Sequence, residues 1–284
     1  MIVDAHTHVF AEAVLRRRAE FAARDAWFGQ LNPPGSRRLA TAPRLIGAMD
    51  AAGVDAAVAL SFGWADHGVC VEQNDCVLAA ARAYPGRLVP FCAVQPAAGP
   101  TAVAELERAA RLGCRGVGEL FPDGQGFALD DRRVMGPLLE ACSALGLVVL
   151  VHASEPVGRV YPGKGRTTPD RLLRLAALAK AVAPDVPLVF AHLGGGLPFY
   201  ELMPDVRALA TGVYYDTGAA AYLYQPEALA YAAALAPGRV LFGSDYPVIG
   251  VQRMIAFAAA AGLPPEAHAA VMGGTAARLF GLAY

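Results

Sequence analysis

Side chains able to ligate a metal or move a proton stand at the ends of short apolar segments of this chain. Only six histidines occur, and four of them each close a run of β-branched or other apolar residues. These are His6, His8, His152 and His192. Asp245 follows another such run. Imidazole nitrogens and carboxylate oxygens are ligands that Zn²⁺, Mn²⁺ and Fe²⁺ accept in proteins, so the residue types predict a site for a divalent metal.

His6 and His8 are separated by one residue, in the sequence Asp4-Ala-His-Thr-His. Side chains of a strand alternate between its two faces, so residues i and i+2 point the same way. Both imidazoles are therefore expected on one face of one strand. An H-x-H pair alone often occurs by chance, and the histidines and Asp245 at other strand ends make the prediction specific. Asp4 shares this face but lies deeper in the barrel, and we expect a buried acceptor that has a structural role or orients a ligand. The alternative is a plain carboxylate at the strand terminus.

The elements that must position these residues alternate between short strands and longer helical segments. Eight strands are predicted, at residues 2–5, 55–60, 88–93, 116–120, 148–152, 188–192, 213–216 and 240–243. Strands that alternate with helices form a parallel sheet. Eight such units close into a (β/α)8 TIM barrel, whereas an open doubly wound sheet usually stops at five or six strands. We therefore predict one barrel domain over residues 1–284.

Two long connections, residues 10–41 and 154–168, lie on the face where the strands end and where barrels build their active sites. Arg159 in the second connection is a candidate for binding a carboxylate or phosphate of a small-molecule substrate. Tyr222, after the seventh strand, and Trp64, after the second, are further candidates for substrate contact. The alternatives are a solvated loop charge for Arg159 and surface packing for Trp64.

Composition excludes several functions. The formal net charge is −1 and no basic stripe occurs, which argues against nucleic-acid binding. No apolar run is long enough for a membrane span, and the N-terminus lacks the pattern of a signal peptide, so we expect a cytoplasmic protein. The five cysteines include no C-x-x-C pair, which argues against a disulfide framework or an all-thiolate zinc site. No serine stands in a G-x-S-x-G motif, so a serine hydrolase has no support. Hydrophobic residues make up 55% of the chain, which leaves room for a homodimer interface.

Three motifs together resemble the amidohydrolase superfamily, and within it the amidohydrolase-related branch. They are Val3-Asp-Ala-His-Thr-His, Ala191-His-Leu-Gly-Gly-Gly and Gly243-Ser-Asp-Tyr-Pro. The resemblance covers nearly the whole chain, and the branch contains lactonases, other hydrolases and non-oxidative decarboxylases. It implies that four residues ligate the metal and that His192 binds metal or polarises the substrate. The four implied ligands are His6, His8, His152 and Asp245.

Glu119 ends the fourth predicted strand, where the superfamily often places a carboxylated lysine or a glutamate when two metals are bound. The resemblance thus makes Glu119 a candidate bridging ligand. The alternative is a structural carboxylate that pairs with Arg115 or Arg133 or binds a loop amide. The sequence therefore allows either one or two bound ions. We expect Zn²⁺, and Mn²⁺ is also suitable.

This ligand set leads us to expect hydrolysis of a carboxylic ester, lactone or amide by metal-bound hydroxide. A divalent metal lowers the pKa of its water from about 15.7 to about 7. Asp245 would hold that water and accept its proton, while the metal, His192 or both would stabilise the oxyanion. The alternative is a metal-dependent non-oxidative decarboxylase of a small aromatic or unsaturated acid, in which the metal binds substrate and no hydroxide attacks. A bridging Glu119 favours the two-metal hydrolase.

Overall fold

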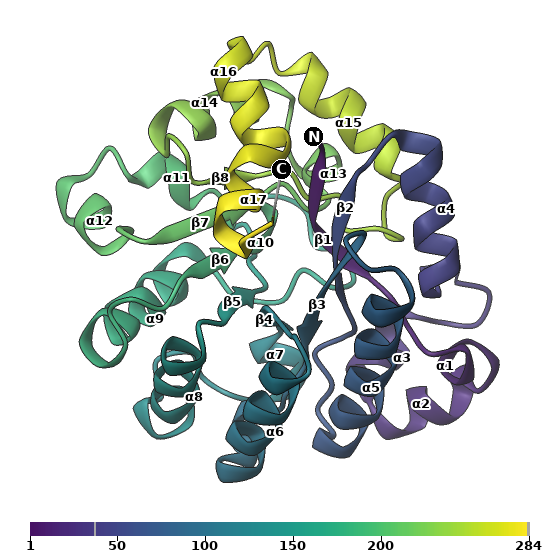
Figure 1. Cartoon of the computed structure of the whole chain (residues 1–284). Helices are drawn as coiled ribbons and strands as arrows, with labels where there is room; N and C mark the ends of the chain where they lie inside the picture. The colour runs from purple at the N-terminus through teal and green to yellow at the C-terminus, as the bar shows by residue number, and fades with distance from the viewer. Residues whose placement is uncertain (37, 283–284) are drawn as a thin grey trace.

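The computed structural model describes residues 1–36 and 38–282, within which eight strands form one sheet. Every strand runs parallel to its neighbours, and their order follows the sequence from β1 to β8. A parallel bridge between Thr7 and Tyr246 joins the first strand to the segment after the last one and closes the ring. Figure 1 shows the helices around the outside of this ring. The predicted (β/α)8 barrel is confirmed.

The strands are short and almost entirely buried, as expected for strands covered on both faces. Their bounds are β1 Val3–His8, β2 Ala56–Leu60, β3 Leu88–Cys92, β4 Gly116–Leu120, β5 Val148–Val151, β6 Leu188–Phe190, β7 Val213–Asp216 and β8 Val240–Leu241. The helices are α1 Glu12–Arg16, α2 Arg18–Arg24, α3 Ala26–Leu31, α4 Ala42–Ala52, α5 His67–Ala83, η1 Pro96–Ala98, α6 Pro100–Arg111, α7 Pro122–Gln125, α8 Arg132–Leu145, α9 Pro169–Val182, α10 Ala191–Gly194, α11 Leu197–Tyr200, α12 Pro204–Leu209, α13 Ala220–Leu223, α14 Glu227–Leu235, α15 Val251–Ala260, α16 Pro265–Ala269, η2 Ala270–Gly274 and α17 Thr275–Phe280. In the described part of the chain, none of these helices combines the length and the hydropathy needed to cross a membrane.

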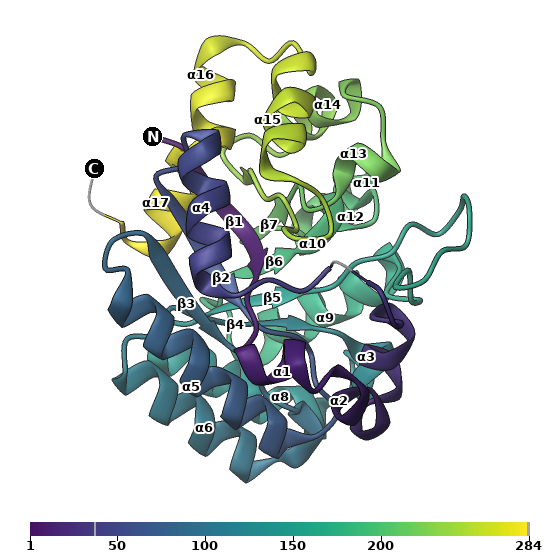
Figure 2. The ribbon, with the colours of Figure 1, turned by 90° about the vertical axis from the view of Figure 1, so that its right-hand side faces the viewer.

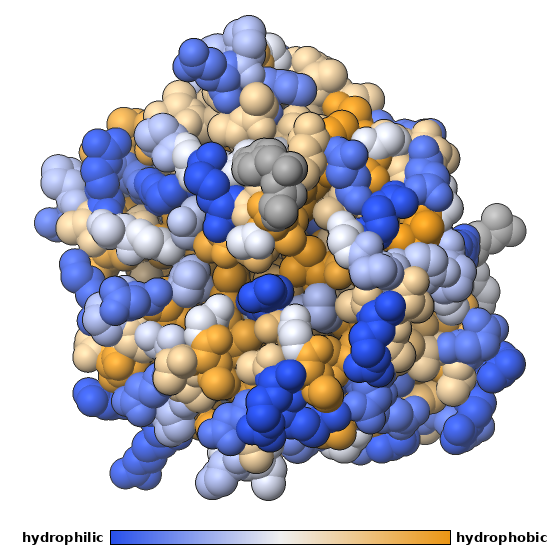
Figure 3. Space-filling view, viewed as in Figure 1, coloured by the Kyte–Doolittle hydropathy of each residue, from blue (hydrophilic) through white to orange (hydrophobic). Residues whose placement is uncertain are grey.

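Apolar side chains fill the inside of the barrel near the N-terminal ends of its strands. Val58 and Val148 belong to this inner cluster, which also takes in Ala276 and Phe280 of α17. The rings of Phe91 and Phe280 meet edge to face with centroids 5.5 Å apart. Figure 3 shows the face of the molecule that carries α17, where apolar side chains gather around the middle and hydrophilic ones cover most of the periphery. This packing closes one end of the barrel and leaves the carboxyl ends of the strands for a site.

The structure differs from the predicted elements mainly near the carboxyl ends of the strands. β1 extends to His8 because its backbone also bonds to the segment after β8, with the His8 N–H donating to the Tyr246 carbonyl over 2.7 Å. Residues 10–41 are not one loop, since they contain α1, α2 and α3. Residues 154–168 have no helix or strand, and Figure 2 shows an arm between β5 and α9 that extends away from the barrel.

A buried ion pair between Glu201 and Arg239 stabilises the outer layer next to β7. Glu201 is 1% exposed, accepts two hydrogen bonds from the Arg239 guanidinium and accepts a third from the Tyr215 hydroxyl over 2.7 Å. Glu201→Ala is expected to lower the free energy of unfolding by about 3 kcal/mol, because it leaves a guanidinium and a hydroxyl without their partner. Thermal or urea unfolding measures this. Glu20→Ala, in an exposed pair with Arg17, is the control and should leave stability unchanged.

Candidate metal centre

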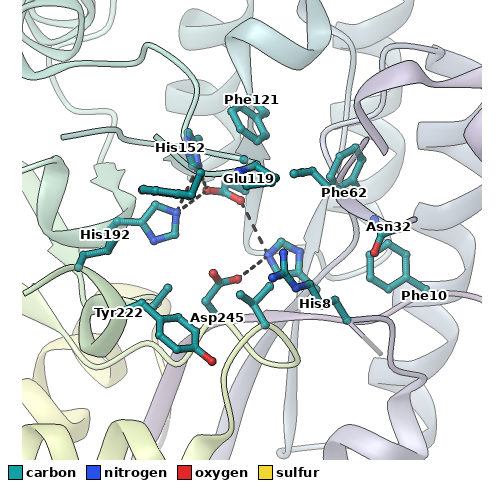
Figure 4. A pocket seen from close by; sticks show the side chains of 18 of the residues that line it. His8, Phe10, Asn32, Phe62, Glu119, Phe121, His152, His192, Tyr222 and Asp245 are labelled. Atoms are coloured by element: carbon teal, nitrogen blue, oxygen red, sulfur yellow. Dashed lines mark hydrogen bonds and ion pairs between the residues drawn. The ribbon is translucent and has the colours of Figure 1, made fainter. Parts of the chain in front are cut away.

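Six ligand-type side chains from different strand ends meet at the carboxyl end of the barrel. They are His6 and His8 on β1, Glu119 on β4, His152 after β5, His192 in α10 after β6, and Asp245 after β8. All six are at most 8% exposed. Figure 4 shows five of them pointing toward a common centre. The barrel brings them together because parallel strands present their carboxyl ends to one face.

The first group of ligand atoms consists of two imidazoles and two carboxylates. His6 Nε2 lies 3.2 Å from His8 Nε2, and Glu119 Oε2 lies 3.7 Å and 3.8 Å from these two atoms. Asp245 Oδ1 lies 3.2 Å from His8 Nε2 and 3.8 Å from His6 Nε2. Ligands at about 2.0–2.1 Å from a tetrahedral ion stand about 3.3 Å from one another. These separations suit one divalent ion.

The second group shares Glu119 with the first. Glu119 Oε1 lies 2.9 Å from His152 Nδ1 and 3.4 Å from His192 Nε2, and the two ring nitrogens are 3.2 Å apart. The two carboxylate oxygens of Glu119 therefore face different pairs of histidines. Its partners are imidazoles, so the expectation of a pair with Arg115 or Arg133 is not what the structure shows.

The outward nitrogens of His6 and His8 fix how the inward ones are protonated. His8 Nδ1 lies 2.5 Å from the Ser61 carbonyl, and His6 Nδ1 lies 2.9 Å from Asp216 Oδ2. A carbonyl or carboxylate oxygen only accepts, so both outward nitrogens carry the hydrogen and donate it. In the neutral imidazoles, both Nε2 atoms then present lone pairs to each other. Two lone pairs at this distance need a cation between them, which is the arrangement of histidines that bind a metal.

The other two histidines are held in the same way. His192 Nδ1 donates to the Gly218 carbonyl over 2.8 Å, and His152 Nε2 donates to the Lys164 carbonyl over 3.0 Å. Their inward nitrogens then present lone pairs to Glu119, which is itself an acceptor. In their neutral form, all four imidazoles thus aim unprotonated nitrogens at buried carboxylates, and this donor set fits a divalent metal.

Without a bound ion, the pKa values of His6, Glu119 and His192 also indicate a site that attracts positive charge. Burial lowers the pKa of His192, but the hydrogen bond and charge of Glu119 outweigh it and hold that pKa at about 9. Burial likewise opposes charge on His6, yet Asp216 and Glu119 raise its pKa well above the usual range. Burial raises the pKa of Glu119, but the surrounding imidazoles bring it well below its ordinary value. The centre thus attracts positive charge, which protons supply when no metal is bound.

Two of the six residues hold a backbone conformation that is rare outside glycine. The φ angle is 57° at His192 and 63° at Asp245. Such left-handed residues cost about 1–3 kcal/mol each and persist where surrounding contacts enforce them. The Asp245 N–H donates to the His6 carbonyl over 2.8 Å, and the His192 N–H donates to Asp216 Oδ1 over 3.1 Å. The metal centre is therefore held together by its own backbone bonds as well as by the barrel.

A cavity of about 490 Å³ opens above these ligands. Aromatic side chains and two guanidinium groups dominate its wall, as Figure 4 shows in part. They are Phe10, Phe62, Phe121, Tyr161, Tyr222, Arg38 and Arg159. The Arg159 guanidinium donates to the Tyr222 carbonyl over 3.2 Å. Both Arg159 and Tyr222, predicted as substrate contacts, thus line this cavity.

Trp64, the third predicted substrate contact, lies elsewhere. It is fully buried and does not line the cavity. Its ring lies 4.7 Å from that of Phe28 and 5.1 Å from that of Phe62, and its indole N–H donates to Ser61 Oγ over 3.2 Å. The prediction for Trp64 is corrected: helix α3 covers it, and Phe62 stands at the cavity in its place.

Asp4 is a buried structural acceptor, which is one of the two roles expected for it. Asp4 Oδ1 accepts from the N–H groups of His6 and Ser244, over 3.2 Å and 2.8 Å, so it bonds to backbone and not to an imidazole. Burial raises the pKa of Asp4 to about 6. The carboxylate that orients His6 is Asp216, the last residue of β7. The signal for Asp216 was present in the sequence, as one more acidic residue at a predicted strand end.

Comparison with known proteins agrees with the barrel fold. The chain matches the family model described as Amidohydrolase over residues 3–282. No curated protein matches it. The structure is similar to that of 5-carboxyvanillate decarboxylase from Sphingomonas paucimobilis, with a TM-score of 0.80, 21% identity and 99% of each chain covered.

Two further solved structures hold a metal. The 5-carboxyvanillate decarboxylase of Novosphingobium aromaticivorans, with manganese and 4-hydroxy-3-methoxy-5-nitrobenzoic acid, has a TM-score of 0.81 and 20% identity, and 99% of this chain and 96% of that one are covered. A dihydroxybenzoic acid decarboxylase from Polaromonas, with manganese and 2-nitroresorcinol, has a TM-score of 0.76 and 20% identity, with 99% and 97% covered. Since the family model spans nearly the whole chain, this protein belongs to the amidohydrolase family.

Proposed function

We propose that this protein is a metal-dependent, non-oxidative decarboxylase of small aromatic carboxylic acids. The observation that carries the proposal is the cavity, whose wall is rich in aromatic rings and whose floor is the ligand cluster. The manganese-containing decarboxylases of similar fold support it. This reverses the order of the two functions expected from the sequence, since hydrolysis was placed first. Mn²⁺ is the ion we propose, ahead of the Zn²⁺ expected from the ligand types.

The residues around the cavity suit an aromatic acid. Phe62 and Phe121 offer ring faces and edges against which a substrate ring can pack. Arg159 at the rim offers a fork of N–H donors for a ring substituent of the substrate, such as a hydroxyl or a second carboxylate. A divalent ion bound at the floor would supply the positive charge that binds the reacting carboxylate.

Decarboxylation replaces a carboxylate on the ring with a proton. The proton adds to the ring carbon, the bond from that carbon to the carboxylate breaks with its electrons left on the ring, and CO2 leaves. We assign the delivery of this proton to Asp245, since it lies on the cavity floor. In the centre without an ion, burial raises the pKa of Asp245, but the hydrogen bond from His8 and the charge of the imidazoles outweigh this and lower it. Asp245 is therefore ionised at rest and takes up a proton, from solvent or a substrate hydroxyl, before delivering it.

Charge favours one ion per chain. Glu119 and Asp245 together carry two negative charges, which neutralise one divalent ion, and Asp216 behind His6 adds a third. A second ion would still leave one positive charge uncompensated among buried side chains, at a cost in free energy. The proposed decarboxylase therefore needs one ion only.

One observation favours a second candidate function, hydrolysis of an ester, lactone or amide. Glu119 directs a separate oxygen at each pair of histidines, which is the arrangement of a carboxylate that bridges two ions. Two ions would clamp the attacking and leaving oxygens of a hydrolytic reaction. In that case Asp245 would accept the proton of the attacking water.

A paired experiment separates the two functions. The enzyme loaded with Mn²⁺ is given hydroxybenzoic acids with CO2 release as the readout, and lactones, esters and amides with acid release as the readout. Elemental analysis counts the ions in the wild type and in Glu119→Ala. CO2 release with one ion per chain supports the decarboxylase. Acid release with two ions in the wild type and fewer in Glu119→Ala would overturn it in favour of the hydrolase.

Arg159→Ala is expected to raise KM about 10-fold and to change kcat little. A charge-assisted hydrogen bond from Arg159 to a ring substituent of the substrate contributes about 1.5–3 kcal/mol, and Arg159 stands at the rim, away from the reacting carboxylate. Steady-state kinetics on the best aromatic acid measure both constants. Arg166→Ala is the matched control, since Arg166 belongs to the same connection but does not line the cavity. An unchanged KM in Arg159→Ala would remove this residue from substrate binding.

A further inference from the structure

Asp216 lies beneath the metal centre and contacts both of its halves. The residue ends β7 and is fully buried. Its Oδ2 accepts from His6 Nδ1 over 2.9 Å. Its Oδ1 accepts from the backbone N–H groups of His192 and Gly218, over 3.1 Å and 2.7 Å. One carboxylate thus joins an imidazole from β1 to the backbone that follows β6 and β7.

The backbone at His192 needs such an anchor. Residues 192–196 all have positive φ angles, and two of them, His192 and Leu193, are not glycine. Consecutive left-handed residues cost about 1–2 kcal/mol each when they carry a side chain. The bond from the His192 N–H to Asp216 holds the first of them. The other N–H bound by Asp216 is that of Gly218. The carbonyl of the same residue accepts from His192 Nδ1 over 2.8 Å.

The backbone around Gly218 is closely packed against three side chains, those of Asp216, His6 and His192. A methyl group at this position would lie 2.9 Å from Asp216 Oδ1, 3.0 Å from His6 Nδ1 and 3.2 Å from His192 Nδ1. Only glycine leaves enough room for the carboxylate and both imidazoles to meet.

We propose that Asp216 is the positioning residue of the metal centre, which fixes the orientation and tautomer of the His6 ring with one oxygen and the place of His192 with the other. The inference rests on the metal centre described above and not on the reaction that runs there. Asp216 itself touches neither the ion nor the substrate.

Asp216→Asn tests this sharply, because an amide has one acceptor where the site needs two. If the amide nitrogen faces His6, Nδ1 must accept, so Nε2 carries the hydrogen and cannot bind a metal. If the amide is turned, its nitrogen faces the N–H groups of His192 and Gly218, so that donors face donors. Neither orientation preserves the centre.

Metal affinity is the main readout, measured for Mn²⁺ and Zn²⁺ by competition with a chromophoric chelator. Groups that orient a metal ligand typically contribute 10- to 100-fold to affinity, and we expect Asp216→Asn to lose at least about 10-fold. The visible spectrum of the Co²⁺-substituted protein should also change, because it reports the ligand set. Gly218→Ala keeps the carboxylate but displaces it, so it should weaken binding as well and serves if Asp216→Asn does not fold.

Glu105→Gln is the matched control. Glu105 is 5% exposed and binds Asn74 and Arg108 between α5 and α6, outside the metal centre. This variant should lower thermal stability and keep the wild-type metal affinity. Asp216→Asn and Gly218→Ala with wild-type affinity and spectrum, even if less stable, would overturn the inference. A wild type that binds no divalent ion would overturn it together with the proposed function, whereas normal metal binding without CO2 release would contradict the proposed function alone.

Discussion

Asp245→Asn is expected to lower kcat about 1,000-fold while the protein keeps its fold and its ion. An amide cannot take up and deliver a proton, and general acid–base groups contribute about 10²- to 10⁴-fold to rate. His6, His8 and Glu119 remain as ligands in this variant, so the metal should stay. Steady-state kinetics give kcat, and elemental analysis of the same sample gives the number of ions per chain.

Asp205→Asn, an exposed carboxylate on α12, is the control and should retain full activity. Wild-type turnover in Asp245→Asn would exclude Asp245 from proton transfer in both candidate reactions. Loss of the ion together with activity would instead show that the carboxylate is needed first as a ligand.

Removal of the metal is expected to abolish turnover and to lower thermal stability. An ion at 100 times its Kd stabilises the folded state by about 2.7 kcal/mol. In a chain of this size that corresponds to a shift in Tm of about 5–10 °C. The measurement is a thermal melt and an activity assay after dialysis against a chelator, and again after Mn²⁺ is restored.

The matched variant for this experiment is the double substitution His6→Asn and His8→Asn. It removes two ligands of the first group, so its Tm should no longer respond to Mn²⁺. Turnover that survives chelation, with no ion left by elemental analysis, would rule out a metal-dependent reaction.

The sequence by itself determined the barrel and most of the candidate ligands. Apolar runs closed by His152 and His192, with helical segments between them, are enough to predict parallel strands with histidines at their ends. The chemistry then follows from topology, because every strand of such a barrel ends on the same face. His6, His8 and Asp245 needed no further information to be placed at one site.

Only the tertiary structure decided which atoms face the ion and which residues support them. The pairing of β1 with β2 shifts register between Asp4 and Thr7, which interrupts the strict alternation that placed Asp4 beside His6. Asp216, which is distant in sequence, orients His6, a role that the sequence had allowed for Asp4. Such contacts depend on how strands stagger around the ring, and the pattern of one strand does not encode that stagger.

The same limit applies to the cavity and to the metal count. Trp64 and Phe62 are two residues apart, yet α3 buries the first and leaves the second at the cavity wall. Glu119 offers one oxygen to each pair of histidines only because the ends of β1, β5 and β6 are a few ångströms from its carboxylate. Sequence pattern specifies the face on which a side chain lies, whereas the distances that select a reaction arise from packing between segments far apart in the chain.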